Sequence, residues 1–188
     1  ENPAANWCYS AEPEENTNGR RMPVPRGKLL GGSSAINGMI FVRGQPLDYD
    51  TWAQLGNRGW SYREVLPFFQ KMEHFDGGDE EYRGRTGPLR VTEIPEVEPL
   101  YQAILDASQQ AGLPFNSDYN GASQEGVSIS QTTISRGRRQ STAHCYLEPA
   151  KTRSNLIIIS EALADRLLFE GSRCVGVSYS RRGTVHKA

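Results

Sequence analysis

Residues 26–44 read RGKLLGGSSAINGMIFVRG, and the rest of this chain is organised around this stretch. Gly31 and Gly32 stand directly before Ser33 and Ser34, and glycine lets a backbone adopt positive φ and approach a bulky group. Serine is a good N-cap, so a helix beginning here would direct unpaired N–H groups and the positive end of its dipole outward. Such a helix start is a favourable binding site for a phosphate group.

The alternative interpretation is a tight Gly-Gly turn between two buried elements, which the dipeptide alone favours. Positive charge lies on both sides of residues 31–38, at Arg26, Lys28 and Arg43, which suits an anionic ligand. No G-x-G-x-x-G motif follows a predicted strand, so the chain has no dinucleotide fingerprint. A nucleotide-binding hypothesis from the residues alone therefore depends on residues 31–38.

Composition predicts a globular, loop-rich protein. The 188 residues are 37% hydrophobic and 23% charged, with nineteen glycines and eleven prolines. This length allows one sizeable domain or pieces of two. A net charge of −1 gives no reason to expect nucleic acid or an anionic membrane surface as a partner. No apolar run approaches the ~20 residues that span a bilayer.

Cysteine and histidine usage predicts no metal site. Cys8, Cys145 and Cys174 are odd in number and widely spaced, and the three histidines show no ligand spacing. Reduced, structural cysteines favour a reducing compartment, so we expect a cytoplasmic protein, with a membrane-associated or periplasmic location left open.

Periodicity and caps predict three helices, at residues 46–55, 61–73 and 99–111. Ser61 and Glu64 have capping-box spacing, and the apolar stripe that follows them is typical of a core-facing helix. A loop entering a further helix is expected over residues 137–147. Strands are expected at 88–92, 127–134, 155–160 (buried), 162–169 and 174–180, the last two joined by a Glu170-Gly171 turn.

The charged, glycine-rich residues 76–87 predict a solvated loop, with a mobile lid near an active site as the alternative. Ser141 and His144 share one predicted helix, but no nucleophile elbow or orienting acid accompanies them, which argues against a hydrolase. Arg138 and Arg139 could contact phosphate or close an interdomain ion pair, and the structural role is favoured.

Residues 26–44 resemble the first signature of the glucose–methanol–choline (GMC) family of flavin oxidoreductases, and the resemblance covers nearly the whole chain. Further blocks occur in the order found in choline-dehydrogenase-like members: Asn6-Trp7, Gly19-Arg20-Arg21, Asp48-Tyr49-Asp50-Thr51-Trp52, Gly59-Trp60-Ser61-Tyr62, Leu66-Pro67-Phe68-Phe69, Tyr82-Arg83-Gly84, Gly87-Pro88-Leu89, Asn120-Gly121, Gln124-Glu125-Gly126, Gly137-Arg138-Arg139, Ser141-Thr142-Ala143, Tyr146-Leu147, Arg153-Ser154-Asn155-Leu156, Phe169-Glu170-Gly171 and Val175-Gly176-Val177.

The resemblance implies an FAD enzyme that oxidises a small-molecule alcohol by moving hydride to flavin N5. It implies a mixed α+β and α/β fold: residues 1–75 and 136–188 would belong to an FAD-binding domain, and residues 76–135 to a substrate domain with an antiparallel sheet. Asn37 and Gly38 would lie at the flavin ring, and the backbone near Ala164 at the adenine, although members more often carry Val at that position. The implied cofactor-binding residues are Arg26, Lys28, Leu30, Gly31, Gly32, Ser33, Ser34, Asn37, Gly38, Met39, Ile40 and Ala164.

Two departures from the family pattern refine the expectation. Members that attach FAD through histidine carry it where this chain has Ile36, so the resemblance implies non-covalent FAD. The family's N-terminal nucleotide fingerprint and its C-terminal catalytic histidine are both missing. We therefore expect an internal segment of a longer enzyme, whose remaining chain is its partner and carries the catalytic base.

Such a segment is expected to be inactive by itself and to retain FAD weakly or not at all. The alternatives are an FAD-containing hydroxynitrile lyase of the same family and a non-catalytic binding module. The alcohol itself, and the choice between oxidase and dehydrogenase, stay open.

Overall fold

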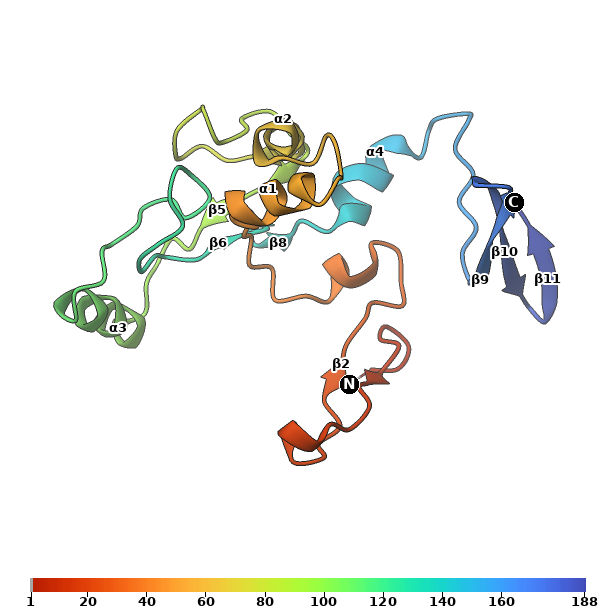
Figure 1. Ribbon diagram of the computed structural model, residues 1–188, viewed down its shortest axis with the longest axis horizontal. Helices are drawn as coiled ribbons and strands as arrows, with labels where there is room; N and C mark the ends of the chain where they lie inside the picture. Colours follow the sequence, from red (N-terminus) through yellow and green to blue (C-terminus); the bar gives the residue numbers. More distant parts are fainter. Residues whose placement is uncertain (1) are drawn as a thin grey trace. The chain divides into compact units, whose positions relative to one another are not determined.

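A computed structural model describes residues 2–188 and divides the chain into two compact units, one ending at Pro149 and one running from Ala150 to Ala188. Helices and short strand pairs alternate in the first unit, and the second contains a three-stranded antiparallel sheet (Figure 1). This mixture confirms the predicted α+β class. The assignment of three segments to the domains of a larger enzyme stays a prediction.

The predicted helices form where the sequence carries start signals. In the capping box of α2, Glu64 Oε2 accepts hydrogen bonds from the Ser61 hydroxyl at 2.6 Å and backbone N–H at 3.1 Å. These bonds lower the pKa of Glu64. Residues 2–188 contain no helix both long and apolar enough to cross a membrane. The helical elements are α1 (Pro46–Gln54), α2 (Tyr62–Met72), α3 (Pro99–Gln110), the short α4 (Glu148–Ala150), 3₁₀ turns at Glu15–Thr17 and Gly32–Ala35, and a π-helical turn at Ala143–Leu147.

Two-residue strands connect the helices of the first unit. The predicted strand 127–134 is wrong as a single element, because the chain changes partners at Thr133, whose N–H donates to Met39 O while its own carbonyl accepts from Gln140 N. The pairs are β1 (Tyr9–Ser10) with β2 (Pro23–Val24), β3 (Glu73–His74) with β4 (Leu89–Arg90), β5 (Thr92–Glu93) with β6 (Gln131–Thr132), and β7 (Ile134–Ser135) with β8 (Arg138–Arg139); the β3–β4 pair is parallel and the others antiparallel.

A small apolar core lies where α2, the β3–β4 pair and the π-helical turn meet. Its buried members are Phe41, Phe75, Leu89, Val91 and Cys145, with Met72 packed against them. Burial of such side chains stabilises a fold by roughly 1.5–3 kcal/mol each. Because Phe41 belongs to the stretch 26–44, this core fixes one end of that stretch.

The second unit confirms the predicted hairpin and adds a strand to it. β9 (Leu163–Glu170) pairs antiparallel with β10 (Arg173–Arg181), which also pairs with the unpredicted β11 (Thr184–Lys187). Gly171 adopts φ 58°, so the predicted turn falls where glycine is favoured.

The buried strand predicted at residues 155–160 is wrong. No strand forms there, and Ile157 is 82% exposed. An apolar, β-branched run becomes a strand only when a neighbouring strand accepts its hydrogen bonds. None of the strand pairings described for residues 2–188 includes this run.

Candidate functional site

Residues 26–44 form the cradle segment, which contains a compact turn. Gly31 and Gly32 adopt left-handed φ values of 91° and 53°, and one 3₁₀ turn, Gly32–Ala35, follows. The expected helix cap is therefore wrong, because Ser33 and Ser34 lie inside this turn. A four-residue turn aligns too few peptide dipoles to provide the expected macrodipole. An anion here would be bound by local backbone and side-chain groups.

One side of the turn is closely packed. A Cβ at Gly27 would lie 2.2 Å from the carbonyl oxygen of Gly32, and one at Gly31 would lie 3.2 Å from Ala143 Cβ. The Gly27 N–H also donates to Ser33 Oγ at 3.2 Å. Glycine is therefore required at position 27 by the close approach of two backbone segments.

The other side of the turn is open. A Cβ built at Gly32 or Gly38 would meet nothing within 4 Å. Asn37, between them, is exposed. Small residues, open space and an exposed amide allow a bulky planar or anionic group to approach the backbone closely, so these residues fit the expected cofactor.

The predicted basic and apolar residues before the turn lie on the surface. Lys28 Nζ lies 4.9 Å from the centroid of the Trp7 ring, a cation–π distance. Arg26 Nη1 donates to the adjacent carbonyl of Pro25 at 2.7 Å, and Leu30 is 49% exposed. Both cationic side chains thus lie at the solvent-facing part of the cradle segment.

The end of the cradle segment runs beside β6. Met39 adopts φ 63°, and its carbonyl accepts the Thr133 N–H at 2.8 Å. Ile40 forms a bridge with Thr132 and is 53% exposed. All the predicted site residues except Ala164 therefore belong to one continuous segment of the first unit. Ala164 lies on β9 of the second unit, opposite Tyr179.

A buried network of charges holds this end of the cradle segment. Glu73 is fully buried, and its Oε1 lies 2.7 Å from Arg43 Nη2 and 2.8 Å from Arg83 Nε. Arg83 is 2% exposed, and its Nη1 donates to Asp118 Oδ1 at 2.5 Å and to Gln131 Oε1 at 3.0 Å. Two cations thus face two anions in the interior. The hydrogen bonds of Arg83 to Glu73 and Asp118 offset part of the desolvation cost. Arg43 Nη2 and Asp118 Oδ2, in contrast, have no hydrogen-bond partner among residues 2–188.

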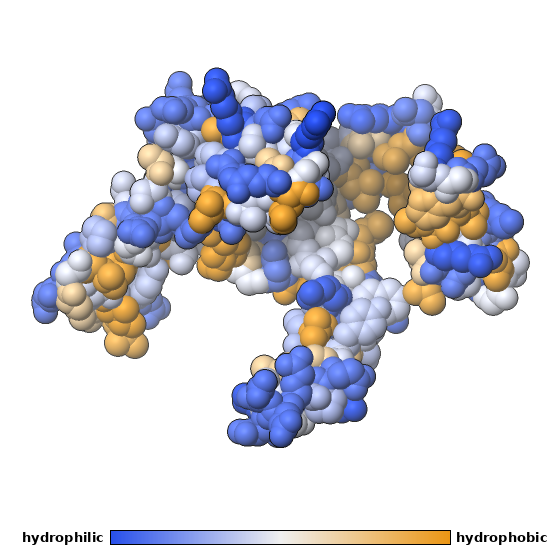
Figure 2. All heavy atoms as spheres, in the orientation of Figure 1, coloured by the Kyte–Doolittle hydropathy of each residue, from blue (hydrophilic) through white to orange (hydrophobic). Residues whose placement is uncertain are grey.

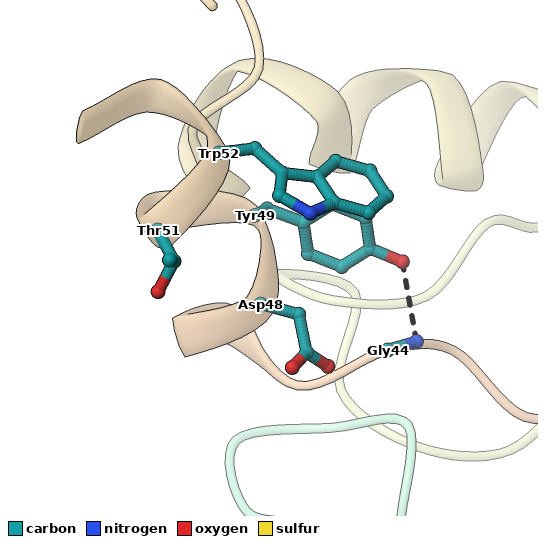
Figure 3. A pocket seen from close by; sticks show the side chains of 5 residues that line it. All are labelled: Gly44, Asp48, Tyr49, Thr51 and Trp52. Carbon is teal, nitrogen blue, oxygen red and sulfur yellow. Dashed lines mark hydrogen bonds between the residues drawn. The ribbon is translucent and has the colours of Figure 1, made fainter. Parts of the chain in front are cut away.

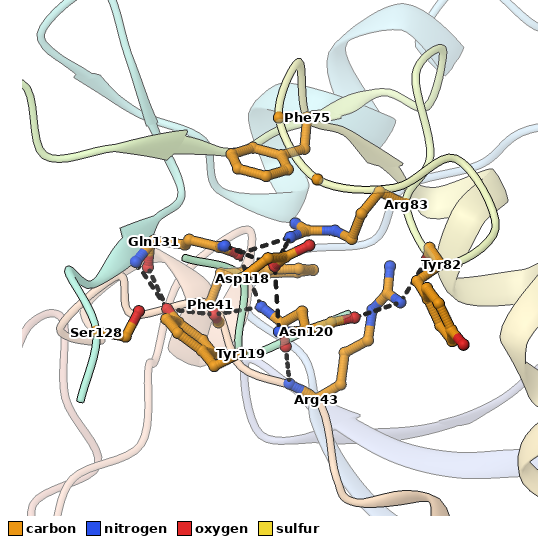
Figure 4. Close-up of polar contacts among 12 residues, drawn as sticks. Phe41, Arg43, Phe75, Tyr82, Arg83, Asp118, Tyr119, Asn120, Ser128 and Gln131 are labelled. Carbon is orange, nitrogen blue, oxygen red and sulfur yellow. Dashed lines mark hydrogen bonds and ion pairs between the residues drawn. The ribbon is translucent and has the colours of Figure 1, made fainter. Parts of the chain in front are cut away.

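Figure 4 shows how this network reaches the cradle backbone. The Asn120 amide donates to Phe41 O at 3.2 Å and to Gln131 Oε1 at 2.8 Å, while its oxygen accepts the Arg43 N–H at 2.8 Å. The Tyr119 hydroxyl donates to Phe41 O at 3.0 Å, and burial raises its pKa. Residues 118–131 therefore fix the backbone around Phe41, which follows Asn37 by four positions.

The solvated loop predicted at residues 76–87 is wrong in its second half. Arg83 is part of the buried network, and a Cβ at Gly84 would lie 1.9 Å from Gln70 O. Arg85 Nη1 donates at 2.5 Å to the carbonyl oxygens of Phe75 and Gly77. The sequence predicted that the charged side chains of residues 76–87 lie in solvent, because a charged, glycine-rich run shows no periodic spacing of apolar residues. The signal that could have found the network was Arg83-Gly84 and Asn120-Gly121 among the family-like blocks.

A shallow hollow of about 360 Å³ lies next to the end of the cradle segment. Gly44, Asp48, Tyr49, Thr51 and Trp52 line it, and the Tyr49 hydroxyl accepts the Gly44 N–H at 3.2 Å (Figure 3). Tyr49 and Trp52 meet edge to face with ring centroids 5.5 Å apart. The Tyr49–Gly44 hydrogen bond thus connects α1 to the end of the cradle segment.

The described residues contain neither a hydrolase arrangement around Ser141 nor a metal site. Ser141 Oγ accepts the backbone N–H of His144 at 3.3 Å, which is a local turn contact. Cys145 is buried, and burial raises the pKa of its thiol, which disfavours the nucleophilic thiolate. No group of three metal-ligating side chains occurs within residues 2–188. The fold and site thus define an α+β segment with an open, glycine- and serine-rich turn.

Comparison with known proteins gives that segment a family. The family model described as GMC oxidoreductase matches residues 10–188, so the chain belongs to the GMC oxidoreductase family. It is 48% identical over 180 residues to an oxygen-dependent choline dehydrogenase of Rhizobium johnstonii, covering 96% of this chain and 33% of the relative. It is 46% identical over 183 residues to the mitochondrial choline dehydrogenase of Homo sapiens, covering 97% and 31%. The chain thus spans about a third of the length of these curated relatives.

Solved structures agree with this membership. Pyridoxine 4-oxidase from Mesorbium loti matches with a TM-score of 0.89 and 32% identity, covering 97% of this chain and 36% of that one. An FAD-dependent oxidoreductase from Chaetomium thermophilum matches with a TM-score of 0.89 and 29% identity, covering 98% and 34%.

Proposed function

We propose that this chain is an internal segment of a longer FAD-dependent, choline-like alcohol dehydrogenase. The observation that carries the proposal is the open side of the cradle segment, where Gly32 and Gly38 leave the backbone accessible on both sides of the exposed Asn37. Support comes from family membership and from relatives that are named choline dehydrogenases. When bound, FAD would supply the hydride acceptor, N5, for oxidation of a primary or secondary alcohol.

The chain's own residues would bind and orient the cofactor. Backbone at Gly31 and Gly32, with Ser33 and Ser34, would pass along the pyrophosphate and ribityl chain, because the space beside Gly32 is open. Arg26 and Lys28 would add positive charge near the phosphates, worth little each at exposed positions and screened by salt.

The side chains available here support non-covalent binding. Ile36 stands directly before Asn37, and a saturated hydrocarbon side chain offers no atom for a flavin linkage. We therefore expect acid precipitation of the loaded protein to release all flavin into the supernatant. Flavin that stays with the precipitated protein would contradict this part of the proposal.

Exposed apolar side chains support the proposal that more protein surrounds this segment. On α3, Leu100 is 75% exposed and Ile104 is 54% exposed, and Phe68 on α2 is 70% exposed. Figure 2 shows hydrophobic side chains on the surface of α3 and on the second unit. Patches of this kind usually mark surfaces that another part of a protein covers.

The experiment compares the 188-residue chain with the full-length protein of which we propose it is a segment. We expect the full-length protein to be purified with flavin and to lose flavin absorbance on anaerobic addition of a substrate alcohol. The 188-residue chain should reduce no dye with alcohol, because the proposed general base lies outside it. Full-length protein that carries flavin but resists bleaching by a panel including choline would contradict the dehydrogenase proposal. A cytoplasmic location is part of the same proposal, and cell fractionation tests it.

A further inference from the structure

Arg139 contacts the cradle segment from a distant part of the sequence. Its Nη1 donates to the Asn37 carbonyl oxygen at 2.7 Å, to Asn37 Oδ1 at 2.8 Å and to the Ser34 carbonyl oxygen at 3.3 Å. Arg139 lies on β8, which pairs with β7 in the register Ile134↔Arg139. The guanidinium thus comes from a hydrogen-bonded hairpin, and Arg139 is more than one hundred positions away from both Ser34 and Asn37 in the sequence.

These contacts decide which way the Asn37 amide points. Its Oδ1 also accepts the Met39 N–H at 3.2 Å, so the carbonyl end of the side chain has two donors. Guanidinium has only donors, so a flipped amide would set NH₂ against Arg139 and lose both bonds. The NH₂ group is therefore the end of Asn37 that stays available for a ligand on the open side of the turn.

A second contact makes the turn itself rigid. The Thr142 N–H donates to Ser34 Oγ at 2.9 Å, and Thr142 Oγ1 donates to Gly31 O at 3.2 Å. Thr142 and Arg139 thus hold the turn at both ends. Arg138, the neighbour of Arg139 on β8, is exposed.

We propose that Arg139 is a positioning residue that holds the Asn37 amide so that its N–H donates to an acceptor atom of the bound isoalloxazine ring. This role rests on the proposed function and deepens it. The chemistry required of the ligand is a ring carbonyl or imine nitrogen, because the group that Asn37 presents is a donor. Arg139 acts through Asn37 and need not contact the flavin.

The test uses the full-length holoenzyme and three substitutions: Arg139→Met, Arg139→Lys, and Arg138→Met as the matched control. A hydrogen bond to a charged group is lost in Arg139→Met, so we expect the dissociation constant of FAD to rise about tenfold and the flavin absorption maximum and midpoint potential to shift. Arg139→Lys should restore part of the affinity, since ammonium also has only donors. Arg138→Met should match the wild type.

Asn37→Asp separates positioning from stability. The carboxylate keeps the contact with Arg139 and thus the thermal stability of the apoprotein, but it removes the donor, so FAD affinity should fall at least as far as in Arg139→Met. If Arg139→Met lowers only the melting temperature and leaves FAD affinity, the potential and the spectrum unchanged, the positioning role is overturned. A wild-type protein that cannot take up flavin overturns the proposed function as well, so the two failures are distinguishable.

Discussion

The substitution Glu73→Gln tests whether the buried charge network stabilises the first unit. Glu73 accepts from Arg83 through both oxygens, with Nε 2.8 Å from Oε1 and Nη2 3.3 Å from Oε2, and Oε1 also accepts the Gly84 N–H at 2.8 Å. Glutamine keeps the shape of the side chain but removes its charge. Asp118 would then be the remaining anion of the network beside Arg43 and Arg83, and the buried cluster would carry net positive charge.

The expected loss follows from that imbalance. Breaking a buried ion pair by removing one partner costs about 3–5 kcal/mol, because the remaining charge stays buried without compensation. The substituted glutamine retains one carbonyl oxygen as an acceptor for Gly84 and Arg83, so we expect a loss of about 3 kcal/mol in the free energy of unfolding. Since native domains are stable by roughly 5–15 kcal/mol, this would remove a large part of the total.

The assay is equilibrium urea unfolding of the chain, followed by tryptophan fluorescence. Two of the three tryptophans, Trp52 in α1 and Trp60 just before α2, meet edge to face with ring centroids 5.7 Å apart. The matched control is Glu80→Gln, because the Glu80 side chain is 83% exposed and its Oε1 lies 3.7 Å from Arg85 Nε. An exposed pair of this kind is worth about 0–1 kcal/mol. A Glu73→Gln loss no larger than that of the control would refute the reasoning.

Three further predictions follow from other contacts. Gly27→Ala should lower the free energy of unfolding by about 3 kcal/mol, because its Cβ would meet the Gly32 carbonyl oxygen at 2.2 Å. Gly38→Ala should leave the free energy of unfolding unchanged yet weaken FAD binding to the full-length protein. Equal stability of the two variants would contradict this prediction. Cys145 should react with a thiol reagent at about pH 8 far more slowly than the two exposed cysteines, since burial raises its pKa, and equal rates would argue that it is accessible. Burial also raises the pKa of Tyr119, so the folded state holds this proton longer than the unfolded chain does, and stability should fall as pH rises through about 10, less steeply in Tyr119→Phe. An unfolding midpoint that does not change with pH between about 9 and 11 would count against that last expectation.

Local signals were sufficient for much of the secondary structure. The Ser61–Glu64 capping box predicted α2, apolar spacing predicted α3, and the Glu170-Gly171 turn predicted the β9–β10 hairpin. Each depends on residues within a few positions of one another, where caps, periodicity and turn preferences act. The same local reasoning failed at residues 155–160, because a strand also needs a partner.

The candidate site divides in the same way. The sequence alone located the cradle segment, because glycines, serines and a family-like order of motifs are visible without coordinates. Its geometry was decided by tertiary structure: Arg83 became a buried ion-pair partner of Glu73, and Arg139 became the donor that orients Asn37. Those contacts join residues ten to more than one hundred positions apart and follow no period. Whether a charged side chain lies in water or in a core depends on which distant groups packing brings to it, and only the folded chain determines that.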